Sequence, residues 1–286
     1  MTQQPGDVFD ANWLSLREPV DHASRARALL PLLAAASRAG RWSRILDLAS
    51  GTGSNIRYLA PRLPAGQEWT LVDNDMDLLA RVQMPDRVRT INRVYGNIAT
   101  EGISAVAEAH LVTCSALLDL VSETWMRTLA EACRSASCGV LLALTYDGRI
   151  EWEDTGVGVP DPADEMVRLA VNAHQTRNKG LGPALGPSAG SVARACFREV
   201  GYWTWFLPSP WCLGPADTEL ASAVVDGWER AAVEERPDQG HAINDWAIRR
   251  QEQLAGHKVG VTVGHVDMLA LPTGTECRSL DSRSRD

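Results

Sequence analysis

The stretch from residue 44 to residue 145 alternates short apolar runs with amphipathic runs, and this alternation restricts the fold more than any other feature. Short apolar runs bounded by turn residues are typical of buried strands, and apolar residues three or four positions apart are typical of helices. Strands that alternate with helices pack as a parallel sheet with helices on both faces. Strands are expected at residues 44–49, 69–72, 88–94, 110–114 and 139–145, and helices between them at about 54–63, 76–83 and 123–136. The sequence therefore predicts an α/β fold with a doubly wound sheet.

Two glycines stand where the first expected strand meets a helix. The stretch from Ile45 to Asn55 reads ILDLASGTGSN and contains Gly51 and Gly53. Glycine tolerates positive φ and leaves room for a ligand, and open α/β sheets bind ligands at the carboxyl ends of their strands. The second strand ends at Asp73, 20–22 residues after the glycines, and a carboxylate there can hydrogen-bond the hydroxyls of a ribose. A turn-forming Asp is common at strand ends, but the three residues together favour a nucleoside site.

The position of the glycines favours one class of nucleoside site over another. A dinucleotide fingerprint would have a third glycine at Ile56. The stretch from Asp47 to Gly53, DLASGTG, instead resembles the first motif of class I S-adenosylmethionine-dependent methyltransferases, in which an acidic residue precedes three glycines at alternate positions. Ala49 replaces the first of these glycines, a small departure that slightly narrows the turn.

Later segments resemble further motifs of the same family, in the expected order. Asp73 matches the acid that binds the ribose, and residues 96–98 (GNI) match the third-strand segment that contacts adenine. Asn97 replaces an Asp in that segment, but its amide can still hydrogen-bond the base. Residues 115–118 (SALL) match the exit of the fourth strand, which lies beside the methionine moiety.

The resemblance covers about residues 42–146, with weaker matches at 189–209 and 257–272. It implies a seven-stranded Rossmann-like sheet and S-adenosylmethionine as the cofactor. The cofactor-binding residues that it implies are Asp47, Ala49, Ser50, Gly51, Gly53, Asn55, Asp73, Asn74, Asn97, Ile98, Ser115 and Ala116.

A leader helix is expected before the first strand. Residues 13–39 have helical spacing of apolar residues, with Pro19 and Asp21 at the start of the main helix. Its first part resembles the leader helix of small-molecule methyltransferases, which folds over the cofactor. Arg17 or Arg25 could pair there with the methionine carboxylate, because a guanidinium suits a carboxylate in a bidentate geometry. A solvated helix face is the alternative interpretation of both arginines.

Beyond residue 147 the alternation stops, and insertions are expected. Residues 148–187 are rich in Gly, Pro, Asp and Asn, with one short helix expected at 163–173. Further helices are expected at 189–199, 217–235 and 241–255, and further strands at 202–207, 259–263 and 266–271. The predicted organisation is an N-terminal helical lid (1–40), a cofactor-binding core (41–210) with a substrate-loop insertion (148–187), a helical cap insertion (211–256), final core strands (257–272) and a disordered tail (273–286).

Composition argues against several classes of protein. The chain has 28 Lys and Arg against 36 Asp and Glu, a net charge of −8, with only two lysines, Lys179 and Lys258. Nucleic-acid sites are usually rich in basic residues, so nucleic-acid binding is not expected. The six cysteines form no Cys-x-x-Cys pair, so no metal site is expected. The acidic start, MTQQPGDVFD, is unlike a signal peptide, and no apolar run approaches the roughly 20 residues of a membrane span, which predicts a cytoplasmic protein without a membrane partner.

Methyl transfer is an in-line displacement, so the chain mainly needs to hold a nucleophile close to the sulfonium carbon. A general base matters only when that nucleophile carries a proton at the working pH. The candidate catalytic residues are His174, Asp147 and Glu151. The candidate substrate-binding residues are Trp152, Asn172, Arg177, Lys179, Trp211 and His265.

Each group of candidates also has a plainer interpretation. Residues 172–183 bring basic and polar groups together between glycines, either as a site for a substrate carboxylate or phosphate or as a solvated loop. Asp147 and Glu151 either orient an amine or cap a turn. His265 is either a base or a core histidine, and the ten tryptophans either line an aromatic pocket or fill the core.

The predicted function is methyl transfer from S-adenosylmethionine to a small organic metabolite, at an O, N or C acceptor. The two insertions support an enclosed small-molecule substrate. An RNA or protein methyltransferase is one alternative, although nucleic-acid amino methyltransferases often carry Asn/Asp-Pro-Pro-Tyr/Phe near the fourth strand, where this chain has SALL. A protein that cyclises or only binds S-adenosylmethionine is another, because fold does not fix function. A homodimer is an open alternative to a monomer.

Overall fold

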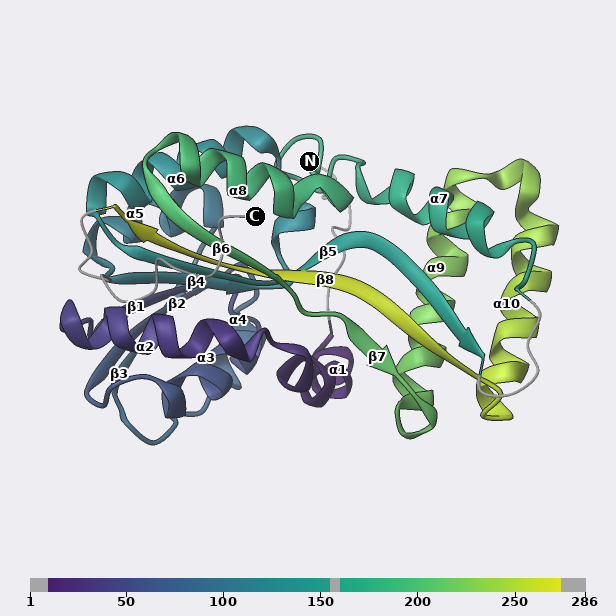
Figure 1. Ribbon diagram of the computed structural model, residues 1–286, viewed down its shortest axis with the longest axis horizontal. Coiled ribbons are helices and arrows are strands. Elements are labelled where there is room, and N and C mark those ends of the chain that lie inside the picture. The colour runs from purple at the N-terminus through teal and green to yellow at the C-terminus, as the bar shows by residue number, and fades with distance from the viewer. Residues whose placement is uncertain (1–9, 155–159, 274–286) are drawn as a thin grey trace.

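In this computed structural model, which describes residues 10–154 and 160–273, one sheet has a parallel half and an antiparallel half (Figure 1). The strands are β1 (Arg44–Leu48), β2 (Gln67–Asp73), β3 (Val88–Tyr95), β4 (Leu111–Ser115), β5 (Gly139–Asp154), β6 (Tyr202–Pro208), β7 (Trp211–Leu213) and β8 (Val259–Pro272). Their order is β3-β2-β1-β4-β5-β8-β6, and β7 pairs with β8 outside that path. Strands β1 to β5 are parallel to one another, whereas β8 is antiparallel to β5, β6 and β7.

Helices cover both faces of this sheet. They are α1 (Ala11–Ser24), α2 (Leu30–Ala39), α3 (Ser54–Leu59), α4 (Met76–Ala80), α5 (Ile103–Ala105), α6 (Glu123–Ala136), α7 (Asp164–Gln175), α8 (Ala189–Glu199), α9 (Thr218–Glu235) and α10 (Gly240–Ala255). Figure 1 shows α5, α6 and α8 over one face, and α2 and α3 over the other. The predicted α/β class with a doubly wound sheet is therefore confirmed.

The strand order reverses between β1 and β4. From β1 the chain proceeds to β2 and β3 on one side, and then crosses to β4 and β5 on the other. The loops that leave β1 and β4 therefore diverge, and the space between them is where open α/β sheets bind ligands.

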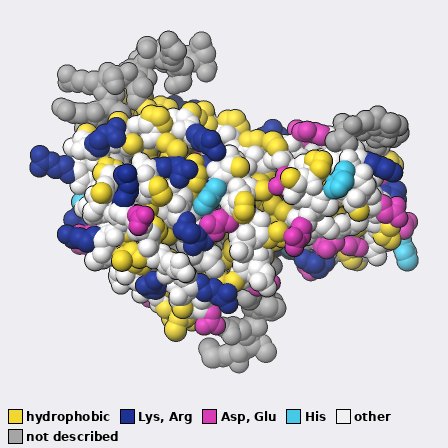
Figure 2. Space-filling view, turned by 90° about the horizontal axis from the view of Figure 1, so that it is seen from below, with side chains coloured by type: hydrophobic (Ala, Val, Ile, Leu, Met, Phe, Trp, Pro, Cys, Tyr) yellow, Lys and Arg dark blue, Asp and Glu magenta, His cyan; other side chains and the backbone are white. Residues whose placement is uncertain are grey.

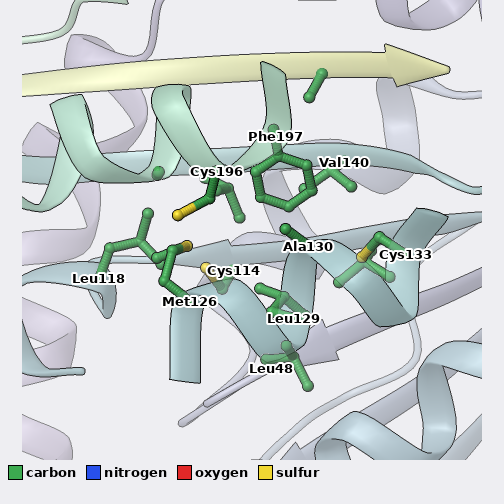
Figure 3. Close-up of a cluster of buried hydrophobic side chains, with 14 of the residues drawn as sticks. Leu48, Cys114, Leu118, Met126, Leu129, Ala130, Cys133, Val140, Cys196 and Phe197 are labelled. Carbon is green, nitrogen blue, oxygen red and sulfur yellow. The ribbon is translucent and has the colours of Figure 1, made fainter. Parts of the chain in front are cut away.

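Helix α6 illustrates how the sequence builds the core. Ser122 caps its start by accepting a hydrogen bond from the backbone N–H of Trp125 at 3.3 Å. Met126, Leu129 and Cys133 recur at helical spacing and are all buried against the sheet (Figure 3). A second core covers the opposite face of the sheet, beneath α2 and α3.

Beyond the main sheet, β5 and β8 continue as a long antiparallel arm that carries α7, α9 and α10 (Figure 1). This arm has its own apolar core. The Trp152 ring makes edge contacts with Trp228 and Trp246, at centroid distances of 6.3 and 6.2 Å. The guanidinium of Arg250 lies 4.2 Å from the centre of the Trp152 ring and is paired with the carboxylate of Asp164. The arm is thus held by a packed aromatic cluster and by the ion pair between the buried Arg250 and the partly exposed Asp164.

The long strands were only partly expected. The loop predicted from residue 148 begins as strand, because β5 runs on to Asp154, and β8 is one strand where two were predicted. A bulge separates the pairs Tyr146–His265 and Ile150–Val263, and Gly148 lies in it at a φ of 89°. This glycine and its polar neighbours account for the expected end of the strand. Strand β7 was not predicted at all.

The leader helix also begins earlier than predicted. Its start is set by Asp10, whose carboxylate accepts hydrogen bonds from the backbone N–H groups of Asn12 and Trp13 at 2.7 and 2.8 Å. Pro19 lies inside this helix instead of at the start of the main one. A proline removes one helical hydrogen bond, which this helix tolerates without ending. The disordered tail predicted from residue 273 lies, from 274 on, outside the described residues.

One buried carboxylate connects the leader segment to the sheet. Asp267 of β8 is 2% exposed and accepts hydrogen bonds from the backbone N–H groups of Leu144 and Ala26, at 2.8 and 2.9 Å. The guanidinium of Arg25 also donates to it, at 3.3 Å, and donates to the side-chain oxygen of Asn55 at 2.9 Å. Because Asn55 lies in α3, this network reaches the glycine loop from the opposite end of the chain.

Replacing Asp267 by Ala should destabilise the protein strongly, because it leaves the buried Arg25 guanidinium without its charged partner. We expect urea unfolding to show a loss of about 3–5 kcal/mol in the free energy of unfolding. Glu199→Gln, which removes one partner of an exposed ion pair with Arg127, is the control and should change stability little. Equal effects of the two substitutions would contradict this role of Asp267.

Candidate functional site

A cavity of about 770 Å³ opens at the point where the strand order reverses. Its walls come from α1, from the glycine loop after β1, from the ends of β2 and β3, and from the segment after β4. A further wall is residues 179–181 of the connection between α7 and α8. Cavities of this size hold small-molecule ligands and cofactors.

The glycine loop adopts the backbone conformation that its sequence predicts. Gly51 and Gly53 have φ values of 50° and 84°. A Cβ on Gly53 would lie 2.8 Å from Cγ1 of Val82, and a Cβ on Gly51 would lie 3.2 Å from Cδ1 of Leu14. Ala49, which replaces the first glycine of the motif, also has a positive φ of 52°, a conformation that costs a residue with a Cβ about 1–2 kcal/mol.

Asp73 is bound to this loop at the end of β2. One of its carboxylate oxygens accepts the backbone N–H of Gly51 at 2.7 Å, and the other accepts that of Asp75 at 2.9 Å. Burial raises the pKa of Asp73, and these backbone hydrogen bonds act in the opposite direction. Asp73 also lines the cavity, so its remaining lone pairs can accept hydrogen bonds from a ligand.

Asp47 and Asn55 form a second, deeper layer. The side-chain amide of Asn55 donates to Asp47 at 2.8 Å and to the Thr113 hydroxyl at 3.0 Å. Asp47 is 1% exposed, and its second carboxylate oxygen has no hydrogen-bond partner among the described residues. Burial raises the pKa of Asp47 to about 7, against the opposing effect of the hydrogen bond from Asn55.

Ten of the twelve residues that the resemblance implied for the cofactor line the cavity. Asp47 and Gly53 are the two that do not. Of the two arginines proposed for a carboxylate, Arg17 lines the cavity, whereas Arg25 is buried beside Asp267.

Arg17 is held in a fixed position on the cavity wall. Its guanidinium makes two hydrogen bonds to Asp21, at 2.8 and 3.1 Å, and lies 4.8 Å from the centre of the Trp211 ring. The indole N–H of Trp211 in turn donates to Asp21 at 3.0 Å. Strand β7, which carries Trp211, therefore fixes the orientation of α1 over the cavity.

The three predicted catalytic residues do not come together at the cavity. His174 is hydrogen-bonded to Glu234 at 3.0 Å, between α7 and α9. Asp147 is paired with Arg149 at 2.9 Å, and Glu151 is exposed on the arm. None of the three lines the cavity. Asp147 and Glu151 are carried away from the edge of the sheet because β5 continues as strand, and His174 lies on α7.

Most of the predicted substrate-binding residues also lie elsewhere. Lys179 lines the cavity. Arg177 is paired with Glu235 at 2.7 Å, Asn172 accepts the phenol hydroxyl of Tyr146 at 2.8 Å, and Trp152 belongs to the core of the arm. Through these contacts the side chains hold α7 against the rest of the arm.

His265 and Trp211 lie behind the cavity wall, where their rings are 5.0 Å apart. The Nδ1 atom of His265 is 3.0 Å from the carbonyl oxygen of Val263, and burial lowers the pKa of His265 to about 3. The ring is therefore neutral at pH 7 and packed as a core histidine.

The sequence analysis overlooked two parts of the cavity. Leu14 covers the glycine loop from α1. Leu120 and Val121 continue the wall past Leu117, which belongs to the predicted segment 115–118, and the buried Asp119 lies between Leu118 and Leu120 in this turn. An acid inside the apolar run LLDLV was the available signal, since buried acids concentrate at functional sites.

Other kinds of site find no support in the described part of the chain. No group of three His, Cys, Asp or Glu side chains there could hold a metal ion. Lys and Arg side chains are scattered singly over the face seen in Figure 2. None of the helices between residues 10 and 273 that the structure describes combines the length and apolar content of a bilayer crossing.

The steric restriction at Gly53 can be tested by comparing alanine substitutions at Gly53 and at Gly66. Gly53→Ala combines a strained φ with a clash at Val82, whereas a Cβ added to Gly66, which has the same φ of 84°, would meet no atom within 4 Å. We expect Gly66→Ala to cost about 1–2 kcal/mol of unfolding free energy. Gly53→Ala should cost about 1–3 kcal/mol more in urea unfolding. Similar losses for both variants would show that Gly53 is only a turn residue.

The buried carboxyl of Asp47 should make stability depend on pH. The folded protein holds its proton up to a pH of about 7, because burial raises the pKa of Asp47, whereas the unfolded chain loses it near the ordinary value of 3.8. The raised pKa of Asp47 therefore stabilises the folded protein fully below pH 3.8, and this stabilisation is lost as the pH rises to about 7. Relative to wild type, Asp47→Asn should gain up to about 1.4 kcal/mol per pH unit across this window in urea unfolding. Parallel pH dependences of the two proteins would contradict the raised pKa.

No family model matches the sequence, and no curated protein matches it either. Among solved structures, a methyltransferase from Geobacter sulfurreducens described as S-adenosylmethionine-dependent and in complex with S-adenosyl-L-homocysteine is 16% identical, with a TM-score of 0.42, over 95% of this chain and 100% of that one. A cyclopropane synthase from Mycobacterium tuberculosis is 11% identical, with a TM-score of 0.45, over 92% and 94% of the two chains. A methyltransferase from Thiobacillus denitrificans, again in complex with S-adenosyl-L-homocysteine, is 15% identical, with a TM-score of 0.41, over 92% and 99%. Because these sequence identities and TM-scores are low, the functional assignment has to rest on the geometry of the site itself.

Proposed function

We propose that the protein is a class I methyltransferase, which binds S-adenosylmethionine in the cavity and transfers its methyl group to a small organic acceptor at O, N or C. The observation that carries this proposal is the hydrogen bond from Gly51 to Asp73 at 2.7 Å. It joins a positive-φ glycine loop to a cavity-lining carboxylate where the strand order reverses. A glycine loop that is hydrogen-bonded to a carboxylate at the carboxyl ends of the strands is suited to binding a nucleoside.

The residues of the cavity fit the parts of this cofactor. Asp73 has lone pairs for the two ribose hydroxyls. Asn97 and Ile98 lie at the wall that the family resemblance associates with adenine, and Ser115 lies at the wall associated with methionine. Arg17 presents a guanidinium, which is suited to the methionine carboxylate.

When bound, S-adenosylmethionine supplies a methyl group on a positively charged sulfur. The chain then has to hold an acceptor in line with that group and to exclude water. Leu14 of α1 and Leu117, Leu120 and Val121 after β4 give the cavity apolar walls. With about 770 Å³, the cavity has room for a nucleoside together with a compact acceptor.

The shape of the site favours a small acceptor over RNA. Helix α1 lies across the glycine loop, because Leu14 contacts Gly51 and Arg17 is fixed through Asp21. The chain carries a net charge of −8. A site partly covered by α1 on an acidic chain suits a metabolite better than a phosphate backbone.

Asp73→Ala should weaken binding of S-adenosylmethionine and S-adenosylhomocysteine by about 1–3 kcal/mol, because the ribose hydroxyls lose a buried acceptor. Isothermal titration calorimetry at constant pH measures this directly. Asp86→Ala, which removes an exposed acid two residues before β3, is the control and should bind as wild type does.

The outcome of this titration decides the proposal. Absence of binding of either ligand to the wild-type protein would overturn it, as would equal affinities of wild type and Asp73→Ala. With binding established, production of S-adenosylhomocysteine from a pool of metabolites indicates methyl transfer, whereas other fragments of the cofactor indicate cyclisation or cleavage.

A further inference from the structure

The face of α1 that covers the cavity carries an ion pair. Leu14, Arg17 and Asp21 follow one another at helical spacing, and all three line the cavity. Leu14 lies over the glycine loop, because a Cβ on Gly51 would be 3.2 Å from its Cδ1 atom. Arg17 and Asp21, one and two turns further along the same face, continue this wall beyond the glycine loop.

The guanidinium of Arg17 uses only one of its two edges to bind Asp21. Its Nε atom donates to one carboxylate oxygen at 2.8 Å, and its Nη2 atom donates to the other at 3.1 Å. A guanidinium can also bind a carboxylate through the edge that Nη1 and Nη2 form. Within residues 10–154 and 160–273, the Nη1 atom of Arg17 donates no hydrogen bond. The second edge can therefore take one more carboxylate in a bidentate pair.

Strand β7 holds the ion pair from its other side. The indole N–H of Trp211 donates at 3.0 Å to the same oxygen of Asp21 that accepts Nη2 of Arg17. The Trp211 ring also lies 4.8 Å from the guanidinium of Arg17, a distance at which a cation and an aromatic ring attract each other. One side chain of β7 thus contacts both members of the pair.

Trp211 is itself fixed by its surroundings. It is buried, it pairs with Val263 of β8 in the sheet, and its ring lies 5.0 Å from that of His265. The side chains of Arg17 and Asp21 are also nearly covered, at 11% and 10% exposed. A guanidinium held in this way loses little freedom when a ligand binds, which favours affinity.

The charges at this wall match those at one end of S-adenosylmethionine. Arg17 and Asp21 together are neutral. The amino-acid end of the cofactor is neutral as well, because it carries one carboxylate and one ammonium group. Placing this zwitterion beside the ion pair leaves no net charge uncompensated at a nearly covered wall.

We propose that Trp211 and Asp21 are positioning residues, which hold the Nε–Nη2 edge of Arg17 so that its Nη1–Nη2 edge binds the carboxylate of the methionine moiety. This inference rests on the proposed function and adds to it a dependence on β7. Recognition of the methionine end is thereby tied to residue 211, at the start of the segment that the sequence predicted to be a helical cap.

The first test asks whether Arg17 binds a carboxylate. Calorimetry at constant pH compares S-adenosylhomocysteine with its primary amide, which keeps the ammonium group and lacks the carboxylate. Wild type should bind the amide at least about 10-fold more weakly, because a charge-assisted bidentate pair is lost. Arg17→Lys keeps the charge but not the planar edge. It should bind S-adenosylhomocysteine at least about 10-fold more weakly than wild type does, and the amide as wild type does.

The second test asks whether Trp211 positions Arg17. Trp211→Phe removes the N–H donor to Asp21 and changes no charge. It should weaken binding of S-adenosylhomocysteine by about 3–10-fold and leave binding of the amide unchanged. Trp228→Phe shortens another buried tryptophan of the arm, which does not line the cavity, and is the matched control that should leave both affinities unchanged.

A second variant tests the same contact without a change at the buried Trp211. Asp21→Glu keeps the negative charge but moves the carboxylate by one methylene, so it should weaken binding of S-adenosylhomocysteine selectively, also by about 3–10-fold. In an Arg17→Lys background, neither Trp211→Phe nor Asp21→Glu should weaken it further, because both act through Arg17.

The outcomes separate this inference from the proposed function. Failure of wild type to bind S-adenosylhomocysteine would overturn the proposed function. Binding of S-adenosylhomocysteine and its amide by wild type with equal affinity would overturn the inference alone. Equal weakening of both ligands by Arg17→Lys would do the same. The positioning role would be overturned if the effects of Trp211→Phe and Arg17→Lys were additive, or if folded Trp211→Phe or Asp21→Glu bound S-adenosylhomocysteine as tightly as wild type.

Discussion

The buried carboxylate of Asp267 is the contact on which the arrangement of the molecule depends. It satisfies the backbone N–H groups of Leu144 and Ala26 and the charge of Arg25, three groups from two segments far apart in sequence. Each would be costly if it were buried without a partner, so the leader segment, β5 and β8 have to assemble together. Through Asn55 the same network reaches the start of α3. The leader helix is therefore fixed relative to the glycine loop before any ligand is considered.

Two buried carboxyl groups, Asp47 and Asp73, lie near the glycine loop, and their contacts give them different capacities. Asp47 lies behind the wall against Asn55, where burial favours its protonated form. Asp73 is held by two backbone N–H groups and faces the cavity beside the glycine loop. The same residue type thus serves as a support and as a ligand-facing acceptor, because burial and hydrogen bonding differ at the two positions.

Strands β5 and β8 run from the main sheet into the arm and connect their hydrophobic cores. Two cores lie on the two faces of the main sheet, and a third lies beneath α7, α9 and α10 (Figure 1). The connection from α7 to α8 returns from the arm to the cavity and brings Lys179 with it. The arm therefore contributes to the site through this loop, whereas His174, on α7 itself, is occupied in holding α9.

The alternation of strands and helices, the glycine loop and the carboxylate at Asp73 could be predicted from the sequence, because they depend on local periodicity and on the backbone freedom of glycine. Helices α6 and α8 have the residues 123–136 and 189–199 that their apolar spacing predicted. The continuation of β5 past its bulge could not be predicted in this way, because a short polar stretch has the sequence of a loop and forms strand here by pairing with β8. That pairing placed Asp147 away from the cavity. Distances between segments far apart in sequence depend on packing and register, and neither is encoded in local spacing.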